Sequence, residues 1–496
     1  MAREPGDLSA SHRAGVRALK NTTVRAAGEI VGKVATFALF AVLARAAGES
    51  DLGAFVFAFA FLQIAMIPIA LGCDSYMLRQ IAKDHSAADR LFWNVIALKL
   101  TLALPVLGVA YAVLEGVSGS ATTRDTVIAL APGLLIDLVT KSLNSVFNAR
   151  ERGMLLAVNL VVQRVVTAAI GIAALAAGYG VVTVAAVYSI GAALGLATAA
   201  TMLARNLGVP RRSIDVSTWR GLTKLSFPFA LQDIFGVLLF KLDAVILAAL
   251  AAEAAVGRYG AAYRLLESTL FIAWALNGAF AAMYAYLQRD SEPPISAVFQ
   301  RSIKAGLVVL TPVALAFGLL AEPIMRVAFG ADFADGAAAL RLLAPVVVLL
   351  GVVTLCTSLI VSRLSPRTMV KLTASMVALN VALNFALIPA YDESGAAAAM
   401  LVTEGVFVVL AMYVSAREVG GIDFRSMLGA PAAGGVAMAA VLVLLGSLPA
   451  LALAAGTVVY AVGYLAVERV VSPDDLAFLR TVLLRRTGRR RLATRG

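Results

Sequence analysis

The sequence has little that could hold a metal ion or a disulfide framework. Its 496 residues include two histidines, His12 and His85, in polar stretches, and two cysteines, Cys73 and Cys356, in or near apolar runs. A His-rich metal site and a disulfide scaffold are therefore excluded, and we expect no cofactor. Charge is also scarce, since only 15% of the residues are Asp, Glu, Lys or Arg. A soluble protein of this length needs more charge to cover its surface.

Apolar residues, by contrast, make up 60% of the chain and recur in runs of about 20. We therefore predict an all-α, polytopic membrane protein with about fourteen transmembrane helices. The first run lacks a small-residue cleavage pattern, so we expect a retained helix rather than a signal peptide. The predicted spans, whose ends are approximate, are 24–46, 51–71, 91–114, 126–148, 154–177, 181–203, 225–250, 257–286, 303–321, 339–361, 369–389, 396–415, 427–446 and 449–468.

The distribution of basic residues predicts the orientation of these spans. With the N-terminus inside, the inner segments hold 31 of the 42 Lys and Arg. The outer connections then hold only five: Arg45, Arg124, Arg258, Arg326 and Arg341. Basic residues stay on the cytoplasmic side of a membrane. We therefore predict a multi-pass protein of the plasma (inner) membrane with both termini in the cytoplasm.

The net charge of +12 follows mostly from this asymmetry and from a basic C-terminal tail. The tail, LRTVLLRRTGRRRLATRG, is typical of a peripheral segment held to anionic lipid. Nucleic-acid binding is the alternative explanation of such a tail, and we do not expect it in a membrane protein of this kind.

A weak internal repeat predicts the domain organisation. The stretch TKLSFPFALQDIFGVLLFKLDAVILA restarts the pattern of NTTVRAAGEIVGKVATFALFAVLA, with a basic start, an acid and then a Lys near the middle. Paired six-helix bundles with a site between them are a known transporter architecture. The predicted parts are a cytoplasmic N-terminus (1–23), a first bundle (24–204), a cytoplasmic linker (205–224), a second bundle (225–416), helices 13 and 14 (427–468) and a basic tail (469–496).

Several stretches resemble a known superfamily. LARAAGESDLGAFVFAFAF and LGCDSYMLRQIAKD in the first half are similar to the start of polysaccharide flippases of the multidrug/oligosaccharidyl-lipid/polysaccharide (MOP) exporter superfamily. LSFPFALQDIFGVLLFKLDAVILAAL, VAFGADFADGAAALRLLAP and LNVALNFALIPAYDESGAAAAMLVTEG resemble the second half. The resemblance covers roughly residues 20–415. It implies a twelve-helix core that moves a polyprenyl-diphosphate-linked oligosaccharide by alternating access. Two further helices also occur in lipid II flippases, whereas drug exporters of the superfamily usually stop at twelve.

Twelve ionisable residues fall inside the predicted spans, away from the span ends, and such residues face a packed interior or a watery cavity. A packing role is one explanation for three pairs: Glu29 with Lys33 and Asp137 with Lys141 at i,i+4, and Arg264 with Glu267 at i,i+3. Each pair could neutralise itself on one helix face. Lys99 could instead extend its ammonium to the inner surface.

A functional explanation uses the distribution of the twelve charges. The first bundle has an excess of basic residues and the second an excess of acidic ones. A basic cavity wall attracts a diphosphate headgroup, while buried carboxylates can carry H⁺ or Na⁺. The candidate substrate-binding residues are Lys33, Lys99, Lys141, Arg164, Lys241 and Arg264. The candidate ion-coupling residues are Glu29, Asp137, Asp233, Asp243, Glu267 and Glu404.

Other polar residues occur at helical spacing: Asn144 and Asn148, Asn159 and Gln163, and Asn380 and Asn384. They could bind sugar hydroxyls or form hydrogen bonds between helices. Prolines within or at the start of spans, Pro228, Pro312 and Pro345, could bend helices for alternating access or simply kink them locally.

Enzyme functions fit the sequence poorly. The stretch GEIVGK has glycines four residues apart, and Val34 replaces the Ser or Thr that a phosphate loop requires. Glu49 and Asp51 resemble the acidic pair of membrane glycosyltransferases, but such enzymes generally need a larger outer loop than any predicted here. Two transporter alternatives stay open: a lipid II flippase, which shares the diphosphate and the lipid, and a cation-coupled drug antiporter. A polysaccharide polymerase machinery is a possible partner.

Overall fold

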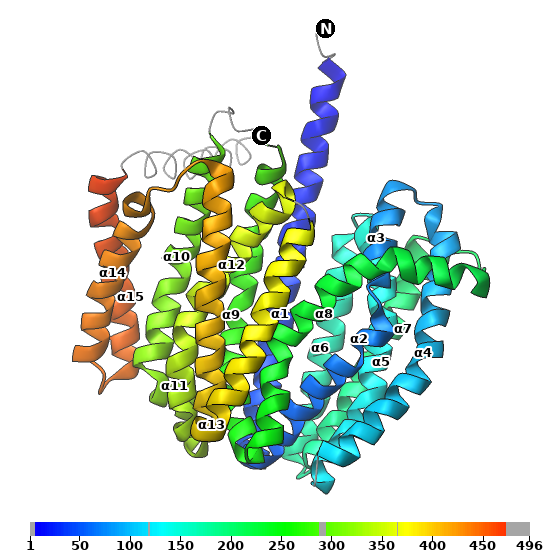
Figure 1. The fold of residues 1–496 in the computed structure, drawn as a ribbon, viewed down its shortest axis with the longest axis horizontal. Helices are drawn as coiled ribbons and strands as arrows, with labels where there is room; N and C mark the ends of the chain where they lie inside the picture. Colours follow the sequence, from blue (N-terminus) through cyan, green and yellow to red (C-terminus); the bar gives the residue numbers. More distant parts are fainter. Residues whose placement is uncertain (1–4, 118–119, 287–293, 365, 473–496) are drawn as a thin grey trace, which may run out of the picture. The chain divides into compact units, whose positions relative to one another are not determined.

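The computed structural model describes residues 5–117, 120–286, 294–364 and 366–472. Within these ranges every regular element is helical (Figure 1). The helices are α1 (Pro5–Ala65), α2 (Ile67–Ala70), α3 (Cys73–Lys83), α4 (Ala87–Val117), α5 (Ala121–Ala149), α6 (Gly153–Ala176), α7 (Val181–Asn206), α8 (Trp219–Leu250), α9 (Glu253–Tyr286), α10 (Ile295–Leu319), α11 (Ala321–Phe329), α12 (Ala337–Arg363), α13 (Pro366–Val419), α14 (Phe424–Leu444) and α15 (Pro449–Val471), with 3₁₀ turns η1 (Val216–Thr218) and η2 (Ala331–Gly336).

The helices confirm the predicted polytopic all-α fold. Ten segments of the described chain are long and apolar enough to cross a membrane. Two of these are divided by a kink, at Gly48 in α1 and at Asp392 in α13, where φ is +80° and +45°. Glycine adopts such a positive φ freely, and Asp tolerates it better than most residues. Helices α8 and α9, with 32 and 34 residues, are also long enough to span the bilayer.

The connections contain helices that the sequence analysis did not anticipate. Helix α3 occupies the predicted inner connection after the second span, and α11 with η2 fills the predicted outer connection before α12. Both α3 and α11 alternate charged and apolar residues, which suits helices that do not span the bilayer. This matters for the site below, because α3 carries Asp74.

The described chain packs into two compact units. The first contains the residues up to Arg264 together with Ala328–Phe333 and Thr373–Ala396. The second contains Leu265–Val327, Ala334–Leu372 and the residues from Ala397 onward. In the first unit α8 packs on α1 and α3, although it follows the predicted linker. The boundaries of the predicted six-helix bundles stay a prediction.

Within the first unit, α5 packs between α1 and α7, and α6 packs on both of those helices. Glycines at positions 28 and 32 bring α1 close to α6. A Cβ at Gly28 would lie 3.0 Å from the Cβ of Ala157, and one at Gly32 would lie 2.7 Å from Cδ of Arg164. Such small-xxx-small spacing allows membrane helices to approach closely. The two glycines of GEIVGK therefore serve packing and make room for Arg164.

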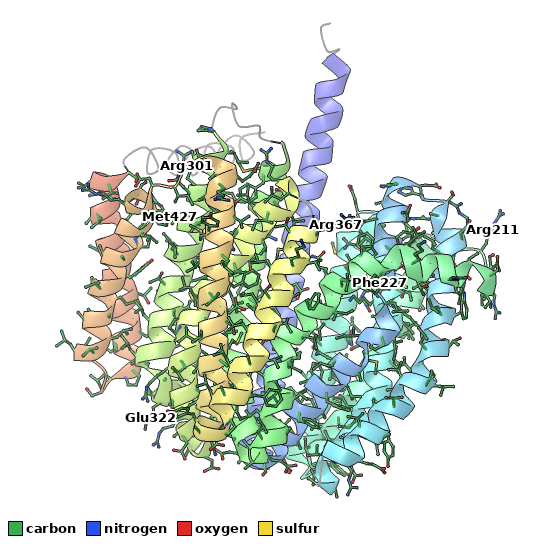
Figure 2. The ribbon with its side chains drawn as sticks, viewed as in Figure 1. Arg211, Phe227, Arg301, Glu322, Arg367 and Met427 are labelled. Carbon is green, nitrogen blue, oxygen red and sulfur yellow. The ribbon has the colours of Figure 1, made fainter. Side chains whose placement is uncertain are left out.

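Within the second unit, α10 packs against α12 and α14, and α14 packs against α15. Figure 2 shows Arg301 on α10 and Glu322 on α11 at opposite ends of this unit. Lys304 of α10 and Glu468 of α15 form a buried ion pair with a distance of 2.9 Å from Nζ to Oε1. This pair fixes the last helix to the rest of the unit.

Candidate functional site

A polar cavity of about 290 Å³ lies in the first unit beside Lys141 of α5. Its wall combines two acids, two amides, two hydroxyls, one amine and several apolar side chains. The lining residues are Glu29, Asp74, Ser75, Leu78, Lys141, Asn144, Ser145, Asn148, Leu156, Ala157 and Leu160. Hydrogen-bonding groups on an apolar background are typical of small-molecule sites.

Lys141 also lines a second cavity of about 270 Å³ in the same unit. This cavity is more apolar, but Asp137, Tyr188 and Asp233 contribute polar atoms to it. Lys141 is exposed. In the part of the chain that the structure describes, its ammonium makes no ion pair or hydrogen bond. Lys141 therefore presents an ammonium without a resolved ion pair to both cavities.

The packing explanation pairs Asp137 with Lys141, and this pairing is wrong because Asp137 has other partners. Its carboxylate accepts hydrogen bonds from two neighbouring helices, through Nε2 of Gln163 at 2.6 Å and through the hydroxyl of Tyr188. These donors stabilise the carboxylate without a cation. The same bonds tie α5 to α6 and α7 and leave the Lys141 ammonium unpaired.

Glu29 likewise finds a partner on another helix. Its Oε2 lies 3.2 Å from Nη1 of Arg164 on α6, and both side chains are about one-third exposed. The expectation that Glu29 is neutralised by Lys33 of its own helix is therefore corrected, since the resolved ion pair of Glu29 crosses to α6. Lys33 is half-buried and has interactions of its own.

Lys99 does not extend toward the membrane surface, so that expectation is wrong. Its side chain is completely buried, and Nζ donates to both carboxylate oxygens of Asp74, at 2.7 and 2.8 Å. It also donates to the Leu138 carbonyl and to Oγ of Ser142, at 2.9 and 2.8 Å. All its donors are engaged, so Lys99 is not available to a headgroup in this structure.

Asp243 of α8 lies in a second buried polar cluster of the first unit. Its carboxylate accepts hydrogen bonds from the hydroxyl of Tyr259 at 3.1 Å and from Nδ2 of Asn384 at 2.8 Å. Asn384 also donates to Oδ1 of Asn380 at 3.0 Å. Oδ1 of Asn384 is buried and accepts no hydrogen bond. Asn384 thus bonds between helices, one of the two predicted roles, whereas the resolved bond of Asn380 stays within α13.

The remaining candidates have different surroundings. Lys241 and Arg264 lie over aromatic rings, 5.4 Å from the centre of Tyr263 and 4.2 Å from that of Phe40. Asp233 lines the cavity of about 270 Å³. In the second unit Glu404 is almost completely buried and Glu267 half-buried, and each has interactions of its own.

An ion-pair cluster that the sequence did not predict lies at the kinks of α1 and α13. Arg258 of α9 binds Glu393 with two bonds, of 2.7 and 3.2 Å, and Glu49 with one of 2.9 Å. Bidentate Arg–carboxylate geometry is among the strongest in proteins. Gly53 and Gly257 allow α1 and α9 to touch here, because a Cβ on either would overlap a backbone carbonyl of the other helix.

This cluster corrects the comparison of Glu49 with a glycosyltransferase acid. Glu49 is engaged by Arg258, so it is not available as a catalytic carboxylate. The ion pair of Asp74 is also one that the sequence did not predict. Asp74 was assigned to an inner connection rather than a span, and no periodic signal marked it as the partner of Lys99. Its position three residues after the second predicted span was the one available hint.

Solved structures of other proteins have a similar fold. A structure described as "Lipid II flippase MurJ, inward closed conformation" matches with a TM-score of 0.73 and 14% identity, covering 90% of this chain and 99% of that one. An inward-facing multidrug resistance MATE family transporter of the MOP superfamily matches with a TM-score of 0.64 and 14% identity, covering 80% and 98%. An outward-facing one has a TM-score of 0.59 and 17% identity, with 82% and 95% coverage.

Sequence comparison adds the family. No curated protein matches this chain. Residues 18–283, more than half of the chain, match the family described as "Polysaccharide biosynthesis protein". This match confirms the resemblance drawn from the sequence. The chain belongs to the polysaccharide biosynthesis protein family, a group of MOP-superfamily membrane transporters and not of enzymes.

Proposed function

We propose that the protein is a flippase that moves a polyprenyl-diphosphate-linked oligosaccharide from the inner to the outer face of the plasma membrane. The observation that carries the proposal is Lys141. It presents an unpaired ammonium to two cavities of a membrane-spanning unit. A diphosphate requires such a charge, and attraction strengthens where the dielectric constant is low.

The rest of the cavity wall supports the same cargo. Asn144 and Asn148 add amide groups, and Ser75 and Ser145 add hydroxyls that can exchange hydrogen bonds with a sugar. Arg164 is held beside this wall by Glu29, which lines the cavity itself. We propose that the diphosphate binds Lys141 first and that the sugars contact the amides. Lys99 takes no part, because its donors are engaged elsewhere.

Energy for transport would come from an ion that binds at Asp243. This carboxylate is buried, its partners are neutral oxygen and nitrogen groups, and an unsatisfied amide oxygen of Asn384 lies in the same cluster. One buried carboxylate beside an amide oxygen that accepts no hydrogen bond fits H⁺ or Na⁺. Asp243→Asn should abolish gradient-driven transport while the protein still inserts. Asp125→Asn, an exposed acid elsewhere, is the matched control, and normal transport by Asp243→Asn would exclude this coupling site.

The predicted orientation also belongs to this proposal. The basic C-terminal tail, proposed to bind anionic lipid, lies outside the described residues apart from its first few positions. Reporter fusions after Ser213 and Arg491 should report a cytoplasmic location, and fusions after Asp335 and Asp392 an external one. An external signal at Ser213 would contradict the two-bundle topology.

The decisive experiment is deletion of the gene followed by analysis of the lipid-linked intermediate that accumulates inside. A diphosphate-linked oligosaccharide of a surface polysaccharide is the expected result. Accumulation of lipid II would instead identify a peptidoglycan precursor as the cargo. If neither accumulates while drug sensitivity rises, the protein is a drug antiporter and the proposal fails.

A further inference from the structure

The cavity of about 520 Å³ in the first unit is separate from the polar wall around Lys141. It lies among α3, the N-terminal turns of α4 and the start of α8, all of which adjoin predicted inner connections. Its wall combines polar and apolar side chains. The lining residues are Tyr76, Gln80, Ala87, Arg90, Leu91, Asn94, Thr218, Gly221, Leu222 and Leu225.

A hydrogen-bond network holds the linker rigidly beside this cavity. Asn94 is its centre, because Nδ2 donates to the Ser213 carbonyl at 3.0 Å and Oδ1 accepts from the Asp215 amide at 2.9 Å. Oδ1 also accepts from the Trp219 indole at 3.1 Å. The indole of Trp93 donates to the Pro210 carbonyl at 2.9 Å. The cavity wall is therefore a built structure and not a gap beside a loose loop.

The surface around the cavity is basic. Arg211, Arg212, Arg220 and Lys224 are all exposed, and none of them forms an ion pair within the residues that the structure describes. Figure 2 shows Arg211, a linker residue, near α4, where its amide donates to Asp89. The surface therefore favours an anionic ligand.

Arg90 brings the same charge into the cavity lining. Its one resolved ion pair, with Asp84, is long at 3.5 Å, and both side chains are exposed. An exposed pair of this kind contributes little and is easily exchanged. The Arg90 guanidinium is thus able to bind an anion at the mouth of the cavity.

Apolar side chains are exposed among these basic residues. Val216 is 65% exposed, and Val209, Ile214, Leu225 and Phe227 are exposed to a similar degree. Figure 2 shows Phe227 on α8, close to the start of the helix. Basic residues interleaved with exposed apolar ones are typical of a segment that lies in the membrane interface.

We propose that this cavity binds one anionic phospholipid of the inner leaflet. The phosphate would lie at Arg90, with the Gln80 amide as a hydrogen-bond donor, and the part of an acyl chain nearest the headgroup would contact Leu91, Leu222 and Leu225. The site is distinct from the cargo path, and the lipid would hold α3, α4 and α8 together. A protein partner is the competing occupant, but the mixed polar and apolar wall beside an interfacial segment favours a lipid.

Substitutions at Gly221 test whether the lipid occupies this cavity. Gly221 lines the cavity, and no atom lies within 4 Å of the position that a Cβ would occupy. Gly221→Leu should therefore fill the cavity without a clash, while Gly221→Ala leaves most of it open. Arg90→Gln removes the proposed phosphate contact. Arg341→Gln, an exposed Arg in the other unit, is the control for charge alone.

Native mass spectrometry of the full-length protein with phosphatidylglycerol or phosphatidylcholine would count the bound lipid. We expect one tightly held phosphatidylglycerol in the wild type, in Gly221→Ala and in Arg341→Gln. Arg90→Gln should bind it about fivefold more weakly, and Gly221→Leu should lose it. Melting temperatures in detergent confirm that each variant is folded.

Three results would overturn the proposal. Equal binding of phosphatidylcholine would exclude recognition of the anionic headgroup. Retention of the lipid by folded Gly221→Leu would place it elsewhere on the surface. Displacement of phosphatidylglycerol by an equal concentration of inorganic phosphate would show that the acyl contacts contribute nothing, and the site would then be a phosphate site only. None of these results would affect the proposed flippase function, which rests on Lys141.

Discussion

Lys99 and Lys141 lie in neighbouring helices of the same unit but in opposite environments. Lys99 is fully buried and donates to Asp74, Ser142 and a backbone carbonyl. Lys141 is exposed to two cavities and has no partner in the described residues. A charge whose bonds are all satisfied specifies packing, whereas an unsatisfied charge is available for a ligand. Residue type alone does not distinguish the two roles.

The buried pair gives the largest expected effect. Asp74→Asn or Lys99→Met alone would leave an uncompensated charge in a dry site, which costs about 3–5 kcal/mol. Either variant should accumulate poorly in the membrane and melt at a lower temperature. The double variant Asp74→Leu with Lys99→Met should recover much of this loss, because both charges are removed together. A single variant with wild-type yield and melting would show that the pair is not needed for folding.

Lys141 gives the next largest effect, and on function rather than folding. Lys141→Gln should express and melt as the wild type does, because no resolved ion pair is lost. Binding of a diphosphate-linked lipid should fall roughly tenfold to a hundredfold, the loss expected for one charged hydrogen bond of about 1.5–3 kcal/mol. Lys141→Arg should keep part of the affinity, since the charge remains while its geometry changes. Unchanged transport by Lys141→Gln would remove Lys141 from the site.

The partly exposed pair of Glu29 with Arg164 lies between these extremes. A double-mutant cycle with Glu29→Gln and Arg164→Gln should give a coupling energy of ~0.2–1 kcal/mol, as for other exposed pairs. Thermal unfolding in detergent measures it.

Adding Lys33→Gln to Glu29→Gln tests the remaining charge on the same helix. If that double variant is folded but inactive in transport, Lys33 contributes to cargo binding. Normal transport would show that both charges have only a packing role.

Asp84 and Arg90 form an exposed ion pair that can be compared with the buried pair of Asp74 and Lys99. Hydrogen bonds from Ser86 lower the pKa of the Asp84 carboxyl below its usual value. Any stabilisation from a depressed pKa is complete above the usual value and fades as the pH falls below it. At neutral pH this stabilisation is complete, but an exposed pair contributes little, so Asp84→Asn should lower the melting temperature only slightly. A clear decrease would show that exposure does not weaken this pair.

The sequence predicts the fold well because span length and apolarity are local properties. Fourteen spans, both C-terminal helices and the superfamily follow from runs of residues such as 427–446 and 449–468. The partners of the intramembrane charges do not follow, because ions pair across helices as readily as along them. Asp137, for example, bonds to Gln163 and Tyr188 rather than to Lys141. Arg258 lies where a predicted outer connection meets a span, and only tertiary packing brings Glu49 and Glu393 to it.

The kinks at Gly48 and Asp392 have a practical consequence. Each reverses the chain within a single residue, where a loop would otherwise be expected. Proteases cut most readily at exposed loop tips. On the predicted outer face these turns would offer almost no such tip, and the carboxylates next to them are tied to Arg258. A protease or an antibody added to intact cells would therefore find few accessible cleavage sites or epitopes near these two turns, although the chain crosses the membrane many times.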